Sequence, residues 1–500
     1  MGPAKPSLEL LRALTDEHVL RALMREGRLT RAELAAATGI SKPTAGESVR
    51  RLVAAGLVAD TGQRTAGGRG RGRVGSYYSL AEDVGLALAV SIAPEGIIAE
   101  CISPYGEVIS RAEQPVDRPA RPEQLAAALR AAATQAVAGL GAPTPAPANP
   151  ATSEAPAIPE PPTIPEAPAA AETPAIAETP ADPAIPKTPA TPAAPATTAP
   201  ATPATTPPAT TAAPATTAPM TTAAPVTMPA PVTMPAPVTT TAAVDPGAQA
   251  AGAATAGPGG PVRLAVVSAA DPVDRASGRM VHLPDSPFLL GDLDPVDALA
   301  PLVAGPVTVD NDVNWAARAE RAAVADPDVP LDDFAYVYLG EGLGCAVVSD
   351  GEVRRGHHGL AGEIAHLLTV GPEGRATSLI EVFGELGLRQ PGATAIDTSR
   401  LLTAVTETPA TLATIAQAVA GAIAAIVALT DPARIILGGP WGPHPRVAEA
   451  ITGAVANLPR PVPVRPAHLT ADPSLAGARE AALTRLQSAI ITRAQPAPAT

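Results

Sequence analysis

The chain has 500 residues, a formal net charge of −13, 61 prolines and two cysteines. Two cysteines exclude a disulfide-stapled scaffold, and their scarcity is typical of the reducing cytosol. The N-terminus has no charged-then-apolar leader, and the sequence predicts no run of about 20 apolar residues that could cross a bilayer. We therefore expect a soluble, cytoplasmic protein without a membrane partner.

The charge is unevenly distributed along the chain. Residues 1–80 carry thirteen Lys and Arg against seven Asp and Glu, whereas the remainder is strongly acidic. A basic module on an acidic body suggests that the module contacts a polyanion. A solvated basic face is the alternative explanation.

The first part of this module has the pattern of two helices. Apolar residues recur at helical spacing over residues 8–26, and Gly27 marks the end of that helix. Thr30 and Glu33 form a capping-box pattern, which predicts a short second helix over residues 31–38.

A third helix follows a tight turn. Gly39 breaks the second helix, Ser41 is a suitable N-cap, and Pro43 fits the first turn of a helix ending at Gly56. Three helices in this order predict a helix-turn-helix. A three-helix bundle of another kind is the alternative.

The third helix has a buried and an exposed stripe. The residues expected to be buried are Ala45, Val49, Leu52 and Val53. Thr44, Glu47 and Arg51 fall on the opposite side, where a major groove would be read. There Glu47 could accept a hydrogen bond from a cytosine amino group.

Residues 57–60 and 76–80 predict the two strands of a wing. Between them, Gly67–Arg73 alternates glycine and arginine, which keeps the backbone slim and suits a narrow minor groove. A flexible loop without a function is the alternative. The residues expected to contact DNA are Ser41, Lys42, Pro43, Thr44, Glu47, Ser48, Arg51, Arg69, Arg71 and Arg73.

After the wing, the sequence first predicts regular secondary structure and then becomes rich in proline. Residues 86–92 and 97–102 predict paired strands joined by a turn, and residues 124–140 predict an alanine-rich helix. From about 141 to 260 the sequence is mostly Pro, Ala and Thr. Such a segment cannot bury a core, so we expect an extended, disordered insert. It would serve as a spacer or as a tether for a partner.

Polar residues follow apolar runs in the last part of the chain. Residues 307–309 form an apolar run that delivers Asn311 and Asp312, as a strand does at a cleft. A glycine-spaced hairpin at Leu339–Cys345 and a Glu/His pair within Gly359–His366 come next. Carboxylates and an amide match the donors and acceptors of a small polyol.

These motifs, followed by Glu381, resemble in their order the ROK family of sugar kinases and sugar-responsive repressors. The resemblance implies a two-lobed α/β domain of the actin-like, sugar-kinase (ribonuclease H-like) type behind a winged helix-turn-helix. We expect the winged helix-turn-helix at residues 1–80, the ROK domain at 84–140 and 261–492, and the insert at 141–260.

The resemblance also implies which residues would bind sugar hydroxyls: Asn311, Asp312, Glu363, His366 and Glu381. In a kinase of the family, Asp312 would accept the proton of the attacking hydroxyl. The alternative is that these residues are buried and satisfy one another.

Two departures from the family pattern bear on function, the first on catalysis and the second on metal binding. The family's first phosphate loop is replaced by Ser91–Glu95, in which Pro94 lacks a backbone donor and Glu95 repels phosphate. No cysteine lies between His366 and Glu381, so the family's zinc knuckle cannot form. We expect no metal, no cofactor and no enzymatic activity.

The sequence thus favours a transcriptional repressor of the ROK type. It would bind a double-stranded DNA operator as a homodimer or homotetramer, and a sugar or sugar phosphate between the lobes would modulate that binding. Two alternatives stay open. One is an ATP-dependent sugar kinase with a DNA-binding module, and the other is a repressor with a vestigial cleft that responds to a protein partner.

Overall fold

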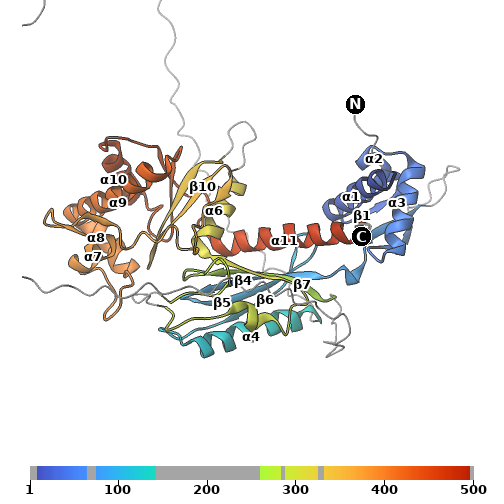
Figure 1. The fold of residues 1–500 in the computed structure, drawn as a ribbon, viewed down its shortest axis with the longest axis horizontal. Helices are drawn as coiled ribbons and strands as arrows, with labels where there is room; N and C mark the ends of the chain where they lie inside the picture. Colours follow the sequence, from blue (N-terminus) through green and yellow to red (C-terminus); the bar gives the residue numbers. More distant parts are fainter. Residues whose placement is uncertain (1–7, 65–74, 142–259, 283–287, 325–330, 496–500) are drawn as a thin grey trace, which may run out of the picture. The chain divides into compact units, whose positions relative to one another are not determined.

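The computed structural model describes a winged helix-turn-helix module and two α/β lobes (Figure 1). The described residues are 8–64, 75–141, 260–282, 288–324 and 331–495. The wing arginines Arg69, Arg71 and Arg73 lie outside the described residues. The same holds for the predicted insert, apart from its two ends.

The N-terminal module begins with the helices that the sequence predicts. α1 (Leu8–Glu26) is followed by α2 (Arg31–Thr38), whose capping box joins Thr30 and Glu33 in both directions. α2 ends at Gly39, which adopts the left-handed conformation that glycine tolerates best. The predicted start and stop signals of α2 are confirmed.

α3 (Lys42–Ala54) forms the third helix, and Ser41 caps it by accepting a hydrogen bond from the backbone N–H of Thr44. Its residues Ala45, Val49 and Leu52 are buried, but Val53 is 43% exposed. The prediction that Val53 is buried is wrong. Successive helical residues are about 100° apart, so Val53 points away from the stripe that Leu52 completes.

The small sheet of the module has one strand that the sequence did not reveal. β2 (Val58–Arg64) and β3 (Ser76–Leu80) pair antiparallel as predicted, and β1 (Arg28–Thr30) pairs with the other edge of β3. β1 has only three residues, which is too few to show an alternating pattern.

The first lobe is built on a five-stranded sheet of order β6-β5-β4-β7-β8. Its first three strands form an antiparallel meander, and β7 and β8 continue the sheet in parallel from β4. α4 covers one face of the sheet and α11 the other (Figure 1). The elements are β4 (Leu86–Ala93), β5 (Gly96–Ile102), β6 (Val108–Gln114), α4 (Pro122–Ala138), β7 (Val262–Ala269), α5 (Pro295–Leu299) and β8 (Val307–Asn311).

The second lobe repeats this topology. Its sheet has the order β11-β10-β9-β14-β15, again an antiparallel meander of three strands extended by two parallel ones. Between β11 and β14 in the sequence, β12 and β13 pair to form a separate two-stranded sheet. The elements are α6 (Asp312–Ala323), β9 (Phe334–Leu339), β10 (Leu343–Ser349), β11 (Glu352–Val353), β12 (Leu368–Val370), β13 (Ala376–Ser378), α7 (Leu379–Glu385), α8 (Thr398–Glu407), α9 (Pro409–Thr430), β14 (Ile435–Gly438), α10 (Pro445–Ala456) and β15 (Val464–Pro466).

α9 corrects one expectation from the sequence. By length and composition it could cross a membrane, with a mean hydropathy of 2.2 over 18 residues, so the prediction that the chain holds no such run is wrong. Half of that apolar window is buried inside the protein. Ile415, Val419 and Ile423 lie in the hydrophobic core of the second lobe, which accounts for the apolar composition of the helix.

The last helix, α11 (Pro473–Ala494), contacts several parts of the molecule. It packs against α6, against β4 and β7 of the first lobe, and against α1 of the N-terminal module. Ile490 near its end shares one buried hydrophobic cluster with Leu20 of α1. Close by, the Arg493 guanidinium donates to the backbone carbonyl of Val84 at 3.3 Å.

Candidate functional site

A cavity of about 910 Å³ lies between the two sheets, within the size range of small-molecule sites. Its wall is formed by the turn between the first two strands of each sheet, by the start of α6 and by the start of α11. Four of the five predicted sugar-binding residues line it, namely Asn311, Asp312, Glu363 and His366.

Asn311 and Asp312 reach the cavity because β8 ends there and α6 begins. The side-chain oxygen of Asn311 caps α6 by accepting from the backbone N–H of Val313 at 3.0 Å. Its amide nitrogen donates to the carbonyls of Ala269 and Asp271 at 3.4 and 3.5 Å. Asn311 therefore fixes the junction of β8 and α6 in addition to facing the cavity.

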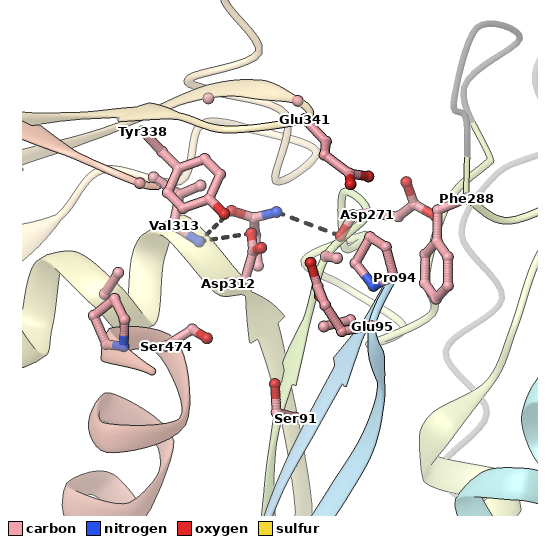
Figure 2. Close-up of a pocket in the computed structure, with 18 of the residues that line it drawn as sticks. Ser91, Pro94, Glu95, Asp271, Phe288, Asp312, Val313, Tyr338, Glu341 and Ser474 are labelled. Carbon is pink, nitrogen blue, oxygen red and sulfur yellow. Dashed lines mark hydrogen bonds between the residues drawn. The ribbon is translucent and has the colours of Figure 1, made fainter. Parts of the chain in front are cut away.

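Asp312 is a strongly perturbed carboxyl group of the site. Burial raises its pKa to about 7, although the backbone N–H of Val313, at 2.7 Å from its oxygen, opposes that shift. The charges of Glu363 and Asp271 add to the rise. Tyr338 lies beside Asp312 in Figure 2, and burial raises the pKa of its phenol as well.

Glu363 comes from the second lobe, and two glycine contacts bring it to the cavity. At Gly362, with φ of 105°, a Cβ would lie 1.8 Å from the carbonyl oxygen of Cys345, so only glycine fits. The Cys345 N–H in turn donates to the Gly362 carbonyl at 2.8 Å. Glu363 opens on the cavity, yet the surrounding protein raises its pKa to about 7 by desolvation, and Asp271 adds to the rise.

The two lobes touch along one edge of the cavity. A Cβ at Gly359 would lie 2.1 Å from the carbonyl oxygen of Val273, so the backbones of the two lobes meet closely there. The Arg275 N–H also donates to the His358 carbonyl at 3.1 Å. The segment that carries Glu363 is therefore held against the loop that follows β7.

Glu381 does not line the cavity. Its side chain is 53% exposed and pairs with Arg389 at 2.7 Å. The expectation that Glu381 contacts a ligand there is not met by the structure. Ile380, one position earlier, faces the cavity, and one residue along the first turn of α7 rotates Glu381 away from it.

An ion pair that the sequence did not predict crosses the cavity mouth. Arg118, from the loop after β6, donates to both carboxylate oxygens of Glu341 at 2.9 and 3.2 Å. Its Nε donates to the Pro94 carbonyl at 2.6 Å, and Glu95 lies 3.9 Å away. Arg118 thus connects the β4–β5 turn of the first lobe to the β9–β10 turn of the second. An isolated arginine in a loop gives no sequence signal for such a role.

The helix-turn-helix module presents to solvent five of the seven predicted DNA-contacting residues that the structure describes. The exposed ones are Ser41, Lys42, Pro43, Thr44 and Glu47. Glu47 pairs with Arg50, which is also exposed and which sequence analysis did not single out. This pairing neutralises the glutamate that is least suited to a phosphate backbone.

Ser48 is fully buried, which corrects its assignment as a DNA contact. Its hydroxyl donates to Asp16 of α1, and Arg51 donates to both oxygens of the same carboxylate at 2.6 and 3.0 Å. Both side chains are thereby committed to the α1–α3 interface. Helical spacing predicted that Arg51 is exposed, but it could not show that α1 supplies the buried Asp16 as a partner.

Within the described ranges, no group of three or more His, Cys, Asp or Glu side chains is arranged to hold a metal ion. Both cysteines are free and buried, and burial raises the pKa of Cys345 to about 12. A neutral, buried thiol at Cys345 serves packing in this structure.

Comparison with known families matches two stretches of the chain. A winged helix-turn-helix DNA-binding family matches residues 12–59, and the ROK family matches residues 253–485. The chain therefore carries a ROK family domain preceded by a winged helix-turn-helix DNA-binding domain, as the sequence motifs indicate.

One solved structure supports the same fold, and a second is reported with it. A ROK family transcriptional regulator, a homologue of the E. coli MLC protein, aligns over 96% of this chain and 99% of its own, with a TM-score of 0.50 and 14% identity. A ROK family glucokinase from Streptomyces griseus, in complex with glucose and AMPPNP, aligns over 80% of this chain and 99% of its own at 17% identity and a TM-score of 0.44.

A glucokinase from Halalkalibacterium halodurans is 42% identical over 71 residues, which make up 14% of this chain. The match spans about a fifth of that enzyme, 21% of its length. So short a match does not transfer the activity of the whole enzyme to this chain.

Proposed function

We propose that this protein is a DNA-binding transcriptional repressor whose affinity for its operator is set by a sugar bound between the two lobes. Residues 1–80 would form the DNA-binding domain, and residues 84–140 and 261–492 the sugar-sensing domain. The protein would act in the cytoplasm, as a homodimer or homotetramer that presents two or more DNA-binding modules to a palindromic operator.

The observation that carries this proposal is the course of α11. Its first turn lines the cavity, where Ser474 points inward (Figure 2). Its last turns share a buried cluster with α1 of the DNA-binding module, to which Ile490 and Leu20 both belong. A ligand that moves the start of α11 therefore acts on the element that supports the DNA-binding module. Such a ligand shifts operator affinity by its differential binding to the two arrangements.

The wall of the cavity also supports a sensing role over phosphoryl transfer. At the β4–β5 turn, Pro94 offers no backbone N–H and its carbonyl is taken by Arg118. Glu95 and Glu341 place two carboxylates at the turns that face each other across the cavity mouth. A nucleoside triphosphate would meet the charge of Glu95 there, and Pro94 offers it no N–H donor to replace its hydration.

A titration of operator release tests the proposal. Purified full-length protein on a labelled operator fragment, selected from random-sequence DNA, is titrated with a panel of sugars while binding is followed by fluorescence anisotropy. We expect one sugar to weaken operator binding at least tenfold. A protein that selects an operator but responds to no sugar would overturn the sensing role and leave a vestigial cavity.

A sugar kinase is the second candidate function, and Asp312 favours it. A carboxylate whose pKa is about 7 is suited to accept a proton from an attacking hydroxyl. A coupled assay of ATP consumption with the same sugar panel decides between the candidates. Turnover that disappears in the Asp312→Asn variant would establish the kinase, whereas we expect no sugar-dependent ATP consumption.

A further inference from the structure

The cavity wall is strongly acidic. Its acidic lining residues are Glu95, Glu113, Asp271, Asp312, Glu341, Glu363 and Asp472. Among the described residues, no Lys or Arg lines the cavity, and His366 is the single basic side chain there. Two cations beside this wall are already paired with its glutamates, Arg111 with Glu113 and Arg118 with Glu341.

This charge distribution disfavours an anionic ligand. A phosphate group needs cationic side chains or a set of converging backbone N–H groups in a site of low dielectric. Glu95, Asp312 and Glu363 would instead repel it, whereas Glu341 is already paired with Arg118. The choice between a sugar and a sugar phosphate is therefore resolved in favour of a ligand without phosphate.

Three of the carboxyl groups repel one another electrostatically. Asp271 is 5% exposed, and its charge raises the pKa values of both Asp312 and Glu363. Repulsion between like charges is reduced when one group takes up a proton or when a cation binds nearby. A ligand ammonium group can supply that cation without a metal.

The rest of the wall suits hydroxyl groups. Asn314, Thr394 and Ser474 line the cavity beside the carboxyl groups. The hydroxyl of Thr398 also borders it and has no hydrogen-bond partner among the described residues. A polyol can use this mixture of donors and acceptors, whereas a simple alkyl amine cannot.

We infer that the ligand sensed in this cavity is a free amino sugar, whose ammonium group binds among Asp271, Asp312 and Glu363 while its hydroxyls contact the polar wall. This inference rests on the proposed sensing function and names the ligand class of the same site. Acylation of the amine would remove the charge, and phosphorylation would add the charge that the wall repels.

Calorimetric titration of the full-length protein with matched pairs of sugars tests the inference. The pairs are glucosamine with glucose, galactosamine with galactose, and mannosamine with mannose, which differ only in an ammonium or a hydroxyl group at one carbon. We expect the amine of at least one pair to bind about tenfold tighter than its neutral partner, since a partly buried charge pair is worth that much. Its 6-phosphate should bind more weakly than the parent amine.

A variant checks that the preference comes from the cavity. Glu363→Gln should bring the two members of the preferred pair to similar affinity, because the amide no longer attracts the ammonium. Glu373→Gln is the matched control, since Glu373 is exposed and outside the cavity, and it should keep the preference. Melting curves of both variants confirm that they are folded.

The outcomes separate this inference from the proposed function. If neutral sugars bind as well as the amines, or a sugar phosphate binds best, and operator release follows, the amine inference is overturned and the sensing role stands. If none of these sugars binds or releases the operator, both are overturned. A preference for an amine that persists in Glu363→Gln would also overturn the assignment of the ammonium to this carboxyl cluster.

Discussion

The two lobes share one sheet topology but differ in the turns that face the cavity. In each lobe, the turn between the first two strands carries a glutamate, Glu95 in the first and Glu341 in the second, and both lie near Arg118. The first turn is stiffened by Pro94, whereas Gly340 and Gly342 flank the glutamate of the second. The same topology therefore places charge at the same point while the backbone chemistry around it diverges.

The ends of the fourth strands show the same contrast. In the first lobe Ala270 follows β7, and its N–H donates to the Ile92 carbonyl at 2.9 Å. In the second lobe Gly439 follows β14 with φ of 81°, and a Cβ there would lie 2.4 Å from the Leu339 carbonyl oxygen. The comparison shows that the second lobe depends on glycine for a close approach of two strands, and the first does not.

The largest effect on stability should come from substituting these two residues one at a time, glycine by alanine and alanine by glycine. Gly439→Ala should lower the free energy of unfolding by about 2–3 kcal/mol, because a left-handed, sterically blocked position resists a side chain. Ala270→Gly should cost less than about 1 kcal/mol, mostly in chain entropy. Denaturation by urea, followed by circular dichroism, measures both. Equal losses would mean that the two strand ends are equivalent after all.

The next effect concerns two carboxyl groups of the cavity, Asp312 at the start of α6 and Glu363 of the second lobe. Asp312→Asn and Glu363→Gln should each reduce sugar affinity roughly tenfold to hundredfold, since a lost acceptor in a closed cavity costs about 1–3 kcal/mol. Operator affinity without sugar should stay nearly unchanged. Asp117→Asn, at an exposed position, is the control for the loss of a charge. An unaltered sugar response in either variant would remove that residue from the sensing site.

The pH dependence of stability sharpens the same comparison. Because the pKa values of Asp312 and Glu363 rise to about 7, the folded chain binds more protons than the unfolded chain above about pH 4. The contribution of these groups to the free energy of unfolding therefore decreases as pH rises from about 4 to 7, and then levels off. Each single variant should remove part of this slope and the double variant most of it. A slope that is unchanged in the double variant would contradict the raised pKa values.

The smallest effect is expected at the connection between the two turns. Arg118→Ala removes the ion pair with Glu341, and for a pair this exposed the loss should be under about 1 kcal/mol. The difference in melting temperature from the parent should shrink in concentrated salt, because ions screen the pair. A large, salt-independent loss would indicate that Arg118 acts through packing.

Local signals in the sequence predicted local structure well, and contacts between distant segments poorly. The capping box of Thr30 and the glycine at Gly39 define both ends of α2 because every contact involved is within a few residues. Asn311 and Asp312 reach the cavity because a strand end places them there. Arg118 and Glu341 are 223 residues apart, and no local pattern joins them.

Errors in the predicted site have the same origin. Ser48 was expected at DNA, but Asp16 on another helix draws its hydroxyl into the core. Glu381 was expected at the ligand, but Arg389 holds it on the outside. In both cases the residue type was suited to the expected role, and a partner elsewhere in the chain decided where the side chain points.

The position of Gly477 has a mechanical consequence for α11. A Cβ there would lie 2.1 Å from the carbonyl oxygen of Trp315, so α11 and α6 cross in backbone contact near the start of α11. A helix of 22 residues is about 33 Å long, and most of that length lies beyond the crossing. If the crossing acts as a fulcrum, the short arm ends at the cavity and the long arm at the DNA-binding module. A given tilt then displaces the module several times farther than the residues that border the cavity.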